Sequence, residues 1–192
     1  MNRMFLESER VILTEISVDD ALLLFELDSD PDVMKHLTDG KPSTMQDIAS
    51  AMERIRKVIE KFQYKFGFWL AYSKENHEFM GWFHFRPGKS TPDDVKNIEL
   101  GYRLKKKFWG KGYATEVSTR LIDIGFEKYE LDSVFATTMK ANLASQKVMQ
   151  KLGLKHASDY EEEGFPGEDK SAVKYVIKKN DWIARRNSFK VR

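Results

Sequence analysis

Hydrophobic and polar positions follow two periodicities along the chain. Between residues 44 and 62, apolar side chains recur every three or four positions, which predicts a helix with one buried stripe. Elsewhere, short apolar or alternating runs bounded by turn residues predict strands. The predicted strands span residues 10–16, 66–73, 78–86, 95–104, 133–139, 155–160 and 171–178. The predicted helices span about 17–28, 44–62, 113–129 and 142–152.

The order of these elements predicts an α/β fold with a mixed sheet and helices on both faces. The 192 residues contain 41% hydrophobic residues and no linker rich in Pro, Gly or Ser, so a single domain with a sizeable core is expected. We assign this domain to residues 1–181. Residues 182–192 are expected to form a basic, partly disordered tail.

Composition excludes several classes of protein. The net charge is only +2, and the absence of cysteine excludes disulfides, thiolate zinc sites and a mechanism that uses a cysteine thioester. The four histidines show no paired metal spacing, so no metal is expected. The first residues do not resemble a signal peptide, and the longest apolar stretch is far shorter than the ~18 residues of a membrane span. A cytoplasmic protein without a membrane partner is therefore predicted.

The most informative segment is a basic, glycine-containing loop between the strand 95–104 and the helix that begins near residue 113. Gly110 and Gly112 permit close backbone approach, free helix N–H groups follow them, and four nearby lysines add positive charge. This pattern is typical of an anion site, although it matches neither the P-loop nor the dinucleotide fingerprint. The alternative is a helix start eased by glycine, with solvated lysines.

Two motifs, residues 102–116 and 142–153, resemble the GNAT superfamily of acetyl-CoA-dependent N-acetyltransferases. Within it, the chain most resembles the branch of ribosomal-protein N-terminal (alanine) acetyltransferases, from about Glu9 to Asp181. The resemblance implies a mixed, mostly antiparallel sheet of about seven strands, with helices on both faces. It also implies a central strand pair that splays after Leu104, with the acetyl and pantetheine groups lying in the gap.

The same resemblance implies that acetyl-CoA is the co-substrate. The pyrophosphate is expected at Lys107, Gly110 and Gly112, with Thr115 near the phosphates. Lys107 replaces the usual Gln or Arg and so lacks a bidentate fork. Asn142 is expected both to cap its helix and to contact the coenzyme. The residues implied to bind the coenzyme are Tyr102, Leu104, Lys107, Gly110, Lys111, Gly112, Tyr113, Ala114, Thr115 and Asn142.

Glu99 and Ser145 are the candidate catalytic residues. Glu99 matches the position of a catalytic glutamate in several family members, and the alternative is a structural ion pair with Arg103 or a lysine. His84 is a rival base that neighbouring strands would bring into the same cleft. Many members use a tyrosine as the acid, but that position is Met149 here. Ser145 matches the serine of the ribosomal-protein branch, and its alternative is a helix-start serine that satisfies backbone groups.

The implied acceptor is a primary amine, either on a protein N-terminus or on a small molecule. Residues 159–169 contain six acids and no base, and an acidic rim there would attract a cationic amine, although a solvated loop is the alternative. No specific nucleic acid is expected, and the protein is predicted to be a monomer or homodimer. Direct attack in a ternary complex is the leading hypothesis. A non-catalytic acyl-CoA-binding or regulatory module is the alternative.

Overall fold

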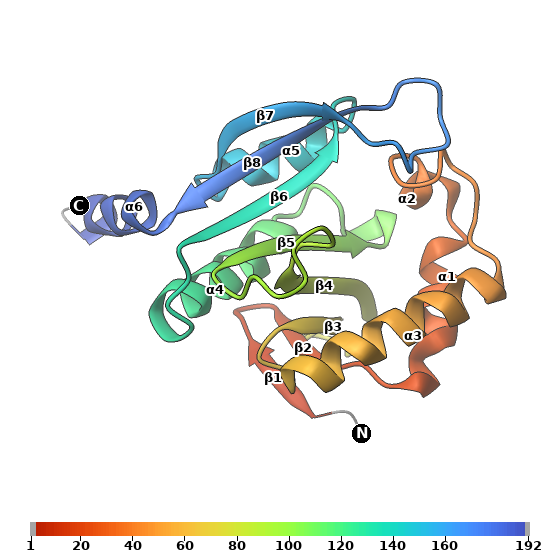
Figure 1. Ribbon diagram of the computed structural model, residues 1–192. Helices are drawn as coiled ribbons and strands as arrows, with labels where there is room; N and C mark the ends of the chain where they lie inside the picture. The colour runs from red at the N-terminus through yellow and green to blue at the C-terminus, as the bar shows by residue number, and fades with distance from the viewer. Residues whose placement is uncertain (1–2, 191–192) are drawn as a thin grey trace.

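The computed structural model describes residues 3–190 and contains an eight-stranded sheet with helices on both faces (Figure 1). The strands are β1 (Met4–Glu7), β2 (Val11–Glu15), β3 (Gly67–Ser73), β4 (Phe79–Pro87), β5 (Asn97–Leu104), β6 (Ser133–Met139), β7 (Lys155–Glu161) and β8 (Ser171–Lys178). The helices are α1 (Ala21–Asp28), α2 (Pro31–Met34), α3 (Met45–Phe62), α4 (Tyr113–Lys128), α5 (Leu143–Lys151) and α6 (Lys179–Lys190), and two 3₁₀ turns are η1 (Val18–Asp20) and η2 (Lys106–Phe108).

The strands lie in the order β1-β2-β3-β4-β5-β6-β8-β7. All neighbouring pairs are antiparallel except β5 and β6, which are parallel. The predicted fold class is therefore confirmed. The strand that the sequence pattern missed is β1, whose four residues are too few to show an alternation.

The parallel pair β5 and β6 separates early. Pairing is confined to Asn97–Glu99 opposite Ser133–Phe135, so the expectation that the strands splay after Leu104 is wrong by five residues. Beyond Glu99, β5 remains paired with β4, while β6 remains paired with β8 along its whole length. Antiparallel ladders are slightly more stable per residue than parallel ones, and each strand keeps its antiparallel partner. Figure 1 shows the two halves of the sheet diverging from this point.

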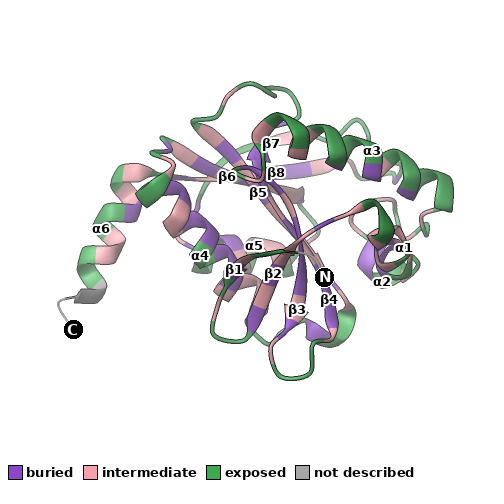
Figure 2. Ribbon diagram, turned by 90° about the horizontal axis from the view of Figure 1, so that it is seen from below, coloured by how far each residue is buried: buried purple, intermediate pink, exposed green. Residues whose placement is uncertain are grey.

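Two hydrophobic clusters hold the helices to opposite faces of the sheet. One joins the sheet to α4 and α5, and the other packs α1 and α3 against β3 and β4. The predicted stripe of α3 is confirmed by buried Ile48, Met52 and Ile55, although Met45 at its start is exposed. Figure 2 shows this division, with buried strands between helices whose outer sides are exposed. Within residues 3–190, no helix is both long and apolar enough for a membrane span.

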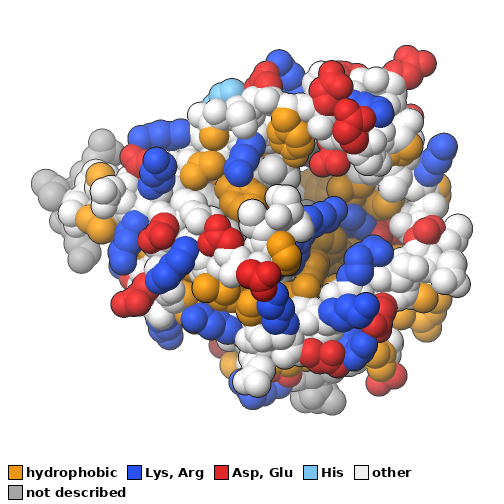
Figure 3. Space-filling view, viewed as in Figure 1, with side chains coloured by type: hydrophobic (Ala, Val, Ile, Leu, Met, Phe, Trp, Pro, Cys, Tyr) orange, Lys and Arg blue, Asp and Glu red, His pale blue; other side chains and the backbone are white. Residues whose placement is uncertain are grey.

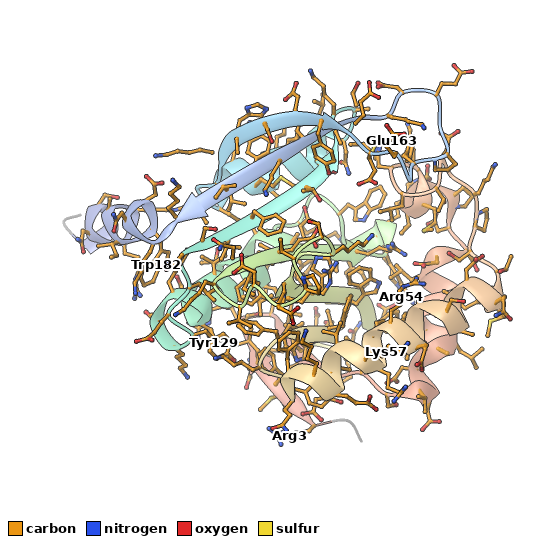
Figure 4. The ribbon with its side chains drawn as sticks, viewed as in Figure 1. Arg3, Arg54, Lys57, Tyr129, Glu163 and Trp182 are labelled. Atoms are coloured by element: carbon orange, nitrogen blue, oxygen red, sulfur yellow. The ribbon has the colours of Figure 1, made fainter. Side chains whose placement is uncertain are left out.

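The segment 182–192, expected to be a basic, partly disordered tail, belongs to helix α6 as far as residue 190, and residues 191–192 lie outside the described residues. Trp182 is 9% exposed, its ring centroid lies 5.2 Å from that of Phe126, and its Nε1 donates to Asp123 Oδ1 at 2.8 Å. Arg186 forms an ion pair with Glu127, also on α4. Figure 4 shows Trp182 between α6 and the body of the domain. The local sequence is charge-rich, so only the tertiary contact of Trp182 reveals an ordered helix.

Candidate active site

The glycine-containing loop ends at the N-terminus of α4. Gly110 and Gly112 have φ of +73° and +86°, a left-handed conformation that favours glycine, and Gly112 caps α4. The first backbone hydrogen bond of α4 runs from Glu116 N to Gly112 O. The N–H groups of Tyr113, Ala114 and Thr115, in the first turn, therefore have no acceptor within the helix. These donors and the helix dipole make an anion site. The predicted loop residues are thus brought together.

Glu116 connects the start of α4 to the turn between β1 and β2, which contains Ser8 and Arg10. Its Oε1 accepts from Ser8 Oγ at 2.7 Å and from Arg10 N at 2.8 Å, and its Oε2 accepts from Arg10 Nε at 2.7 Å. Arg10 Nη1 also donates to Lys111 O at 3.1 Å. Burial alone would raise the pKa of Glu116, but the hydrogen bonds from Ser8 and Arg10 outweigh it and lower the pKa below 4.5. The loop therefore has a fixed position on the sheet.

Three of the four loop lysines form ion pairs, and Lys111 contributes its backbone carbonyl to Arg10. Lys105 pairs with Glu26, Lys106 with Asp32 and Lys107 with Glu78. Lys107 Nζ thus contacts Glu78, which directly precedes β4. Leu104, another predicted residue, is buried, and its carbonyl accepts from Trp109 Nε1 at 2.7 Å.

Tyr102, Asn142 and Ser145 meet at the start of α5. The Asn142 side chain caps α5 by accepting from Ser145 N at 3.1 Å, as predicted. The Tyr102 hydroxyl lies 3.5 Å from Ser145 Oγ. Burial raises the pKa of Tyr102, so its hydroxyl stays protonated and able to donate. Met149 is buried in the core beneath them.

Glu99 lies on the opposite face of β5, at the last position that pairs with β6. Its Oε2 is 2.9 Å from Arg86 Nη2, and Thr137 Oγ1 donates to its Oε1 at 3.4 Å. The expected ion-pair partners were Arg103 or a lysine; the partner is Arg86, because the register sets it directly across from Glu99 on β4. Arg103 instead pairs with Asp28.

His84 shares this face, two residues before Arg86 and opposite Gly101. A Cβ at position 101 would lie only 2.5 Å from His84 Nε2, so the ring needs the glycine beneath it. Nε2 is covered and has no hydrogen-bond partner within residues 3–190. Burial, assisted by the cations of Arg86 and other residues, lowers the pKa of His84 well below 6.5. The imidazole is therefore neutral near pH 7.

The acidic segment 159–169 lies over this face. Phe165 is buried, and a Cβ at Gly167 would lie 3.2 Å from Asp39, which follows α2. Figure 4 shows Glu163 on the outside of this loop, and Figure 3 shows a hollow below it with hydrophobic and basic side chains around it. Two of the six acids form ion pairs with lysines, Asp159 with Lys140 and Glu163 with Lys170. The loop bounds the hollow, but its charge is partly neutralised.

Sequence reasoning missed the residues that hold the site in place. Glu116 lies inside the glycine motif, yet its partner is more than a hundred positions away, so no local signal identifies the contact. The pairing of Arg86 with Glu99 follows from the register of β4 and β5, which the long connection between these strands leaves undetermined in the sequence. Within residues 3–190, no group of three or more metal-binding side chains is assembled.

Comparison with known proteins gives consistent results. Residues 10–155 match the profile of the acetyltransferase (GNAT) domain family. The FsC-acetyl coenzyme A-N(2)-transacetylase of Aspergillus fumigatus is 29% identical over 93% of this chain and 77% of that protein. Among solved structures, the ribosomal-protein-S5-alanine acetyltransferase of Vibrio fischeri has a TM-score of 0.74 at 18% identity, covering 94% of this chain and 99% of that one.

A ribosomal L7/L12 alpha-N-protein acetyltransferase, solved in complex with coenzyme A, has a TM-score of 0.73 at 14% identity, covering 92% of this chain and 98% of that one. These two structures share the fold, and the family match covers most of the chain, including the glycine loop, Glu99 and the start of α5. The chain therefore belongs to the GNAT family and is an acetyl-CoA-dependent N-acetyltransferase.

Proposed function

We propose that this enzyme transfers the acetyl group to a primary amine by direct attack in a ternary complex. The observation that carries the proposal is the arrangement around the gap between β5 and β6. Glu99 lies on one side of β5, the Tyr102 and Ser145 hydroxyls lie on the other, and the N-terminus of α4 lies beyond the end of β5. A base, an acid and an anion site are thus separate but adjacent.

The coenzyme fits the chemistry of the residues present. Gly110 and Gly112 leave the backbone open, and the first turn of α4, residues 113–115, offers N–H donors to the pyrophosphate. Beyond Glu99, the edge of β5 that faces β6 has no strand partner among the described residues, while the other edge stays paired with β4. The backbone groups of this free edge are available to pantetheine and to the thioester oxygen. A backbone donor of this type typically contributes ~2.7–4 kcal/mol to transition-state stabilisation.

Glu99 is the proposed base. The attacking amine must be neutral, so a proton has to leave it before or during attack on the thioester carbon. Arg86 and Thr137 hold the two carboxylate oxygens in place and so orient the side chain toward the gap. A bound water between Glu99 and the amine is the proposed proton path. His84 is a weaker candidate, because its Nε2 is covered by its neighbours.

Ser145 is the proposed acid for the departing thiolate. Its Oγ lies 3.5 Å from the Tyr102 hydroxyl, which can resupply a proton. A thiolate is a good leaving group, so a weakly acidic hydroxyl suffices. Of the proteins compared, one is named as an N(2)-transacetylase and two as acetyltransferases of ribosomal proteins. These names support an amine acceptor, either on a small molecule or on a protein.

The first test is thermal unfolding with and without acetyl-CoA. A ligand at a hundred times its Kd stabilises the native state by ~2.7 kcal/mol, which at ~2–4 °C per kcal/mol raises Tm by ~5–11 °C. Thiol release is then followed with a panel of primary amines. An unchanged Tm in millimolar acetyl-CoA would refute the coenzyme site, whereas a raised Tm without thiol release from any amine would refute the acceptor proposal.

Two variants test the catalytic roles. Glu99→Gln is expected to lower kcat by ~10²–10⁴-fold, the usual contribution of a general base. Ser145→Ala should give a smaller loss, because the leaving group is good. Glu60→Gln, which changes an exposed acid on α3, is the matched control and should retain full activity. Full activity in Glu99→Gln would eliminate Glu99 as the base.

A further inference from the structure

Unpartnered polar atoms gather at one place on the face that carries Glu99. Six buried side-chain polar atoms within residues 3–190 have no hydrogen-bond partner: Thr14 Oγ1, Asp28 Oδ1, Trp69 Nε1, His84 Nε2, Arg103 Nε and Ser118 Oγ. Three of them belong to Asp28, His84 and Arg103. His84 lies opposite Gly101 and Trp82 opposite Arg103 in the β4–β5 register, so these atoms are neighbours.

Asp28 and Arg103 form an ion pair at the C-terminal end of α1. Their side chains are 9% and 17% exposed. The Asp28 Oδ2 atom accepts from Arg103 Nη1 and lies 3.4 Å from Ser43 Oγ, whereas its Oδ1 is unused. The Arg103 guanidinium lies 5.0 Å from the centre of the Trp82 ring, and its Nε–H is unused.

A buried ion pair of this kind needs its remaining hydrogen-bonding groups satisfied. Removing both charges from water costs several kcal/mol per ion, and the attraction between them offsets this only when other partners are present. The large majority of buried side-chain polar atoms in proteins have a hydrogen-bond partner. Two open groups within one pair, next to a third on His84, therefore indicate a place where a ligand supplies the missing partners.

The two open groups define the chemistry of that ligand. Asp28 Oδ1 can only accept a hydrogen bond, and Arg103 Nε–H can only donate one. A carboxylate would be repelled by Asp28, and a second ammonium would be repelled by Arg103. The group that complements both is neutral and presents a donor beside an acceptor, as one residue of an extended peptide does with its own N–H and C=O.

We propose that the Asp28–Arg103 pair recognises the backbone amide N–H and C=O of one residue of the acceptor, at a distance from the amine that is attacked. This inference rests on the proposed function, because it takes Glu99 as the place of the amine. Four residues of β5 separate Glu99 from Arg103, about 13 Å at ~3.3 Å per residue. An extended acceptor of about three to four residues spans that length.

Engagement requires a small rearrangement. The open atoms are covered by neighbouring side chains, so an acceptor reaches them only after one of these side chains shifts. Trp82 is placed to do so, because its indole lies over the Arg103 guanidinium and is only partly buried.

The test uses the full-length enzyme, acetyl-CoA and a tetra-alanine amide, compared with three depsipeptides. Each depsipeptide replaces one backbone amide N–H with an ester oxygen and so removes one donor without changing the length. One ester position is expected to lower kcat/KM by ~10–100-fold, the size of a hydrogen bond to a charged group. The other two positions should lower it by less than about threefold. Equal rates for all four substrates would overturn the inference.

Variants assign the effect to the pair. In Asp28→Asn, the ratio of amide to ester rates at the sensitive position should fall severalfold. Asp28→Leu combined with Arg103→Met removes both charges together, avoids an unpaired buried ion and should bring the ratio to about one. Asp30→Asn, at the exposed cap of α2, is the matched control and should keep the wild-type ratio.

Acetylation of a simple alkylamine separates the two proposals. If alkylamine and both kinds of peptide are acetylated equally, the proposed function stands and the amide recognition is wrong. If no amine is acetylated although acetyl-CoA binds, the proposed function fails and the recognition fails with it. A wild-type ratio in the double variant would assign the amide contact to other residues and overturn the inference.

Discussion

Glu116→Gln tests whether a contact distant in sequence positions the coenzyme loop. The substitution keeps the shape of the side chain but removes its charge. In the wild type, the carboxylate accepts from Ser8 Oγ, Arg10 N and Arg10 Nε, and Arg10 in turn donates to Lys111 O beside Gly112. Neutralising position 116 should therefore weaken both the fold and the anion site.

The expected loss of stability is about 1–2 kcal/mol. Hydrogen bonds to charged groups contribute ~1.5–3 kcal/mol, against ~0.5–1.5 kcal/mol for neutral ones, and two of the three bonds are made by side chains. Glu116 also lies in the first turn of α4, where a negative charge contributes ~0.3–1 kcal/mol. The Arg10 side chain is 43% exposed, so solvent screens its share and the lower part of the range applies. For a domain of this size, Tm should fall by ~2–8 °C.

The effect has a defined pH dependence. The folded-state pKa of Glu116 lies below its ordinary value of 4.5, so the carboxylate stabilises the fold fully above about pH 4.5. This contribution is lost as the pH falls through the folded-state pKa. The difference in stability between wild type and Glu116→Gln should thus be constant near pH 7 and shrink in acid. Urea unfolding at several pH values measures it.

The same variant should raise KM for acetyl-CoA more than it lowers kcat, because the loop and not the reacting atoms is disturbed. Glu127→Gln is the control, since it removes a more exposed ion pair from the same helix. That variant should lose less than about 0.5 kcal/mol and keep the wild-type KM. A Glu116→Gln protein with unchanged stability and unchanged KM would refute the positioning role.

Two other substitutions test the loop and α6. Gly112→Ala should destabilise the protein by ~1–2 kcal/mol and raise KM for acetyl-CoA, because φ is +86° at this position; the new Cβ itself meets only Arg10 Nη2, at 3.5 Å. Gly164→Ala is the control, and equal Tm values for the two variants would contradict the predicted backbone strain at Gly112. Trp182→Ala should lower the free energy of unfolding by ~3 kcal/mol and expose α6 to trypsin, whereas Ile183→Ala, at an exposed position, should do neither. Resistance of Trp182→Ala to trypsin would show that α6 does not depend on the Trp182 contact.

Local sequence was sufficient for most of the secondary structure. The α3 stripe has a strong helical period, and Thr44 and Asp47 form the capping box that starts it. Gly112 marks the start of α4 because it adopts the left-handed backbone conformation there, and Asn142 marks the start of α5 because its side chain accepts a hydrogen bond from the first turn. The two motifs that resemble the family lie at these same helix starts.

Tertiary structure decided which side chains meet. The partner of Glu99 depends on the register between β4 and β5, the early splay depends on the competing ladders of β4 and β8, and α6 depends on the burial of Trp182. These outcomes are set by contacts between residues far apart in the chain. The sequence by itself thus determined the elements and the loop chemistry, because helix periods, caps and glycine conformations are local. Only the packed fold determined the ion pairs and the shape of the site, because these require distant strands to be brought into register.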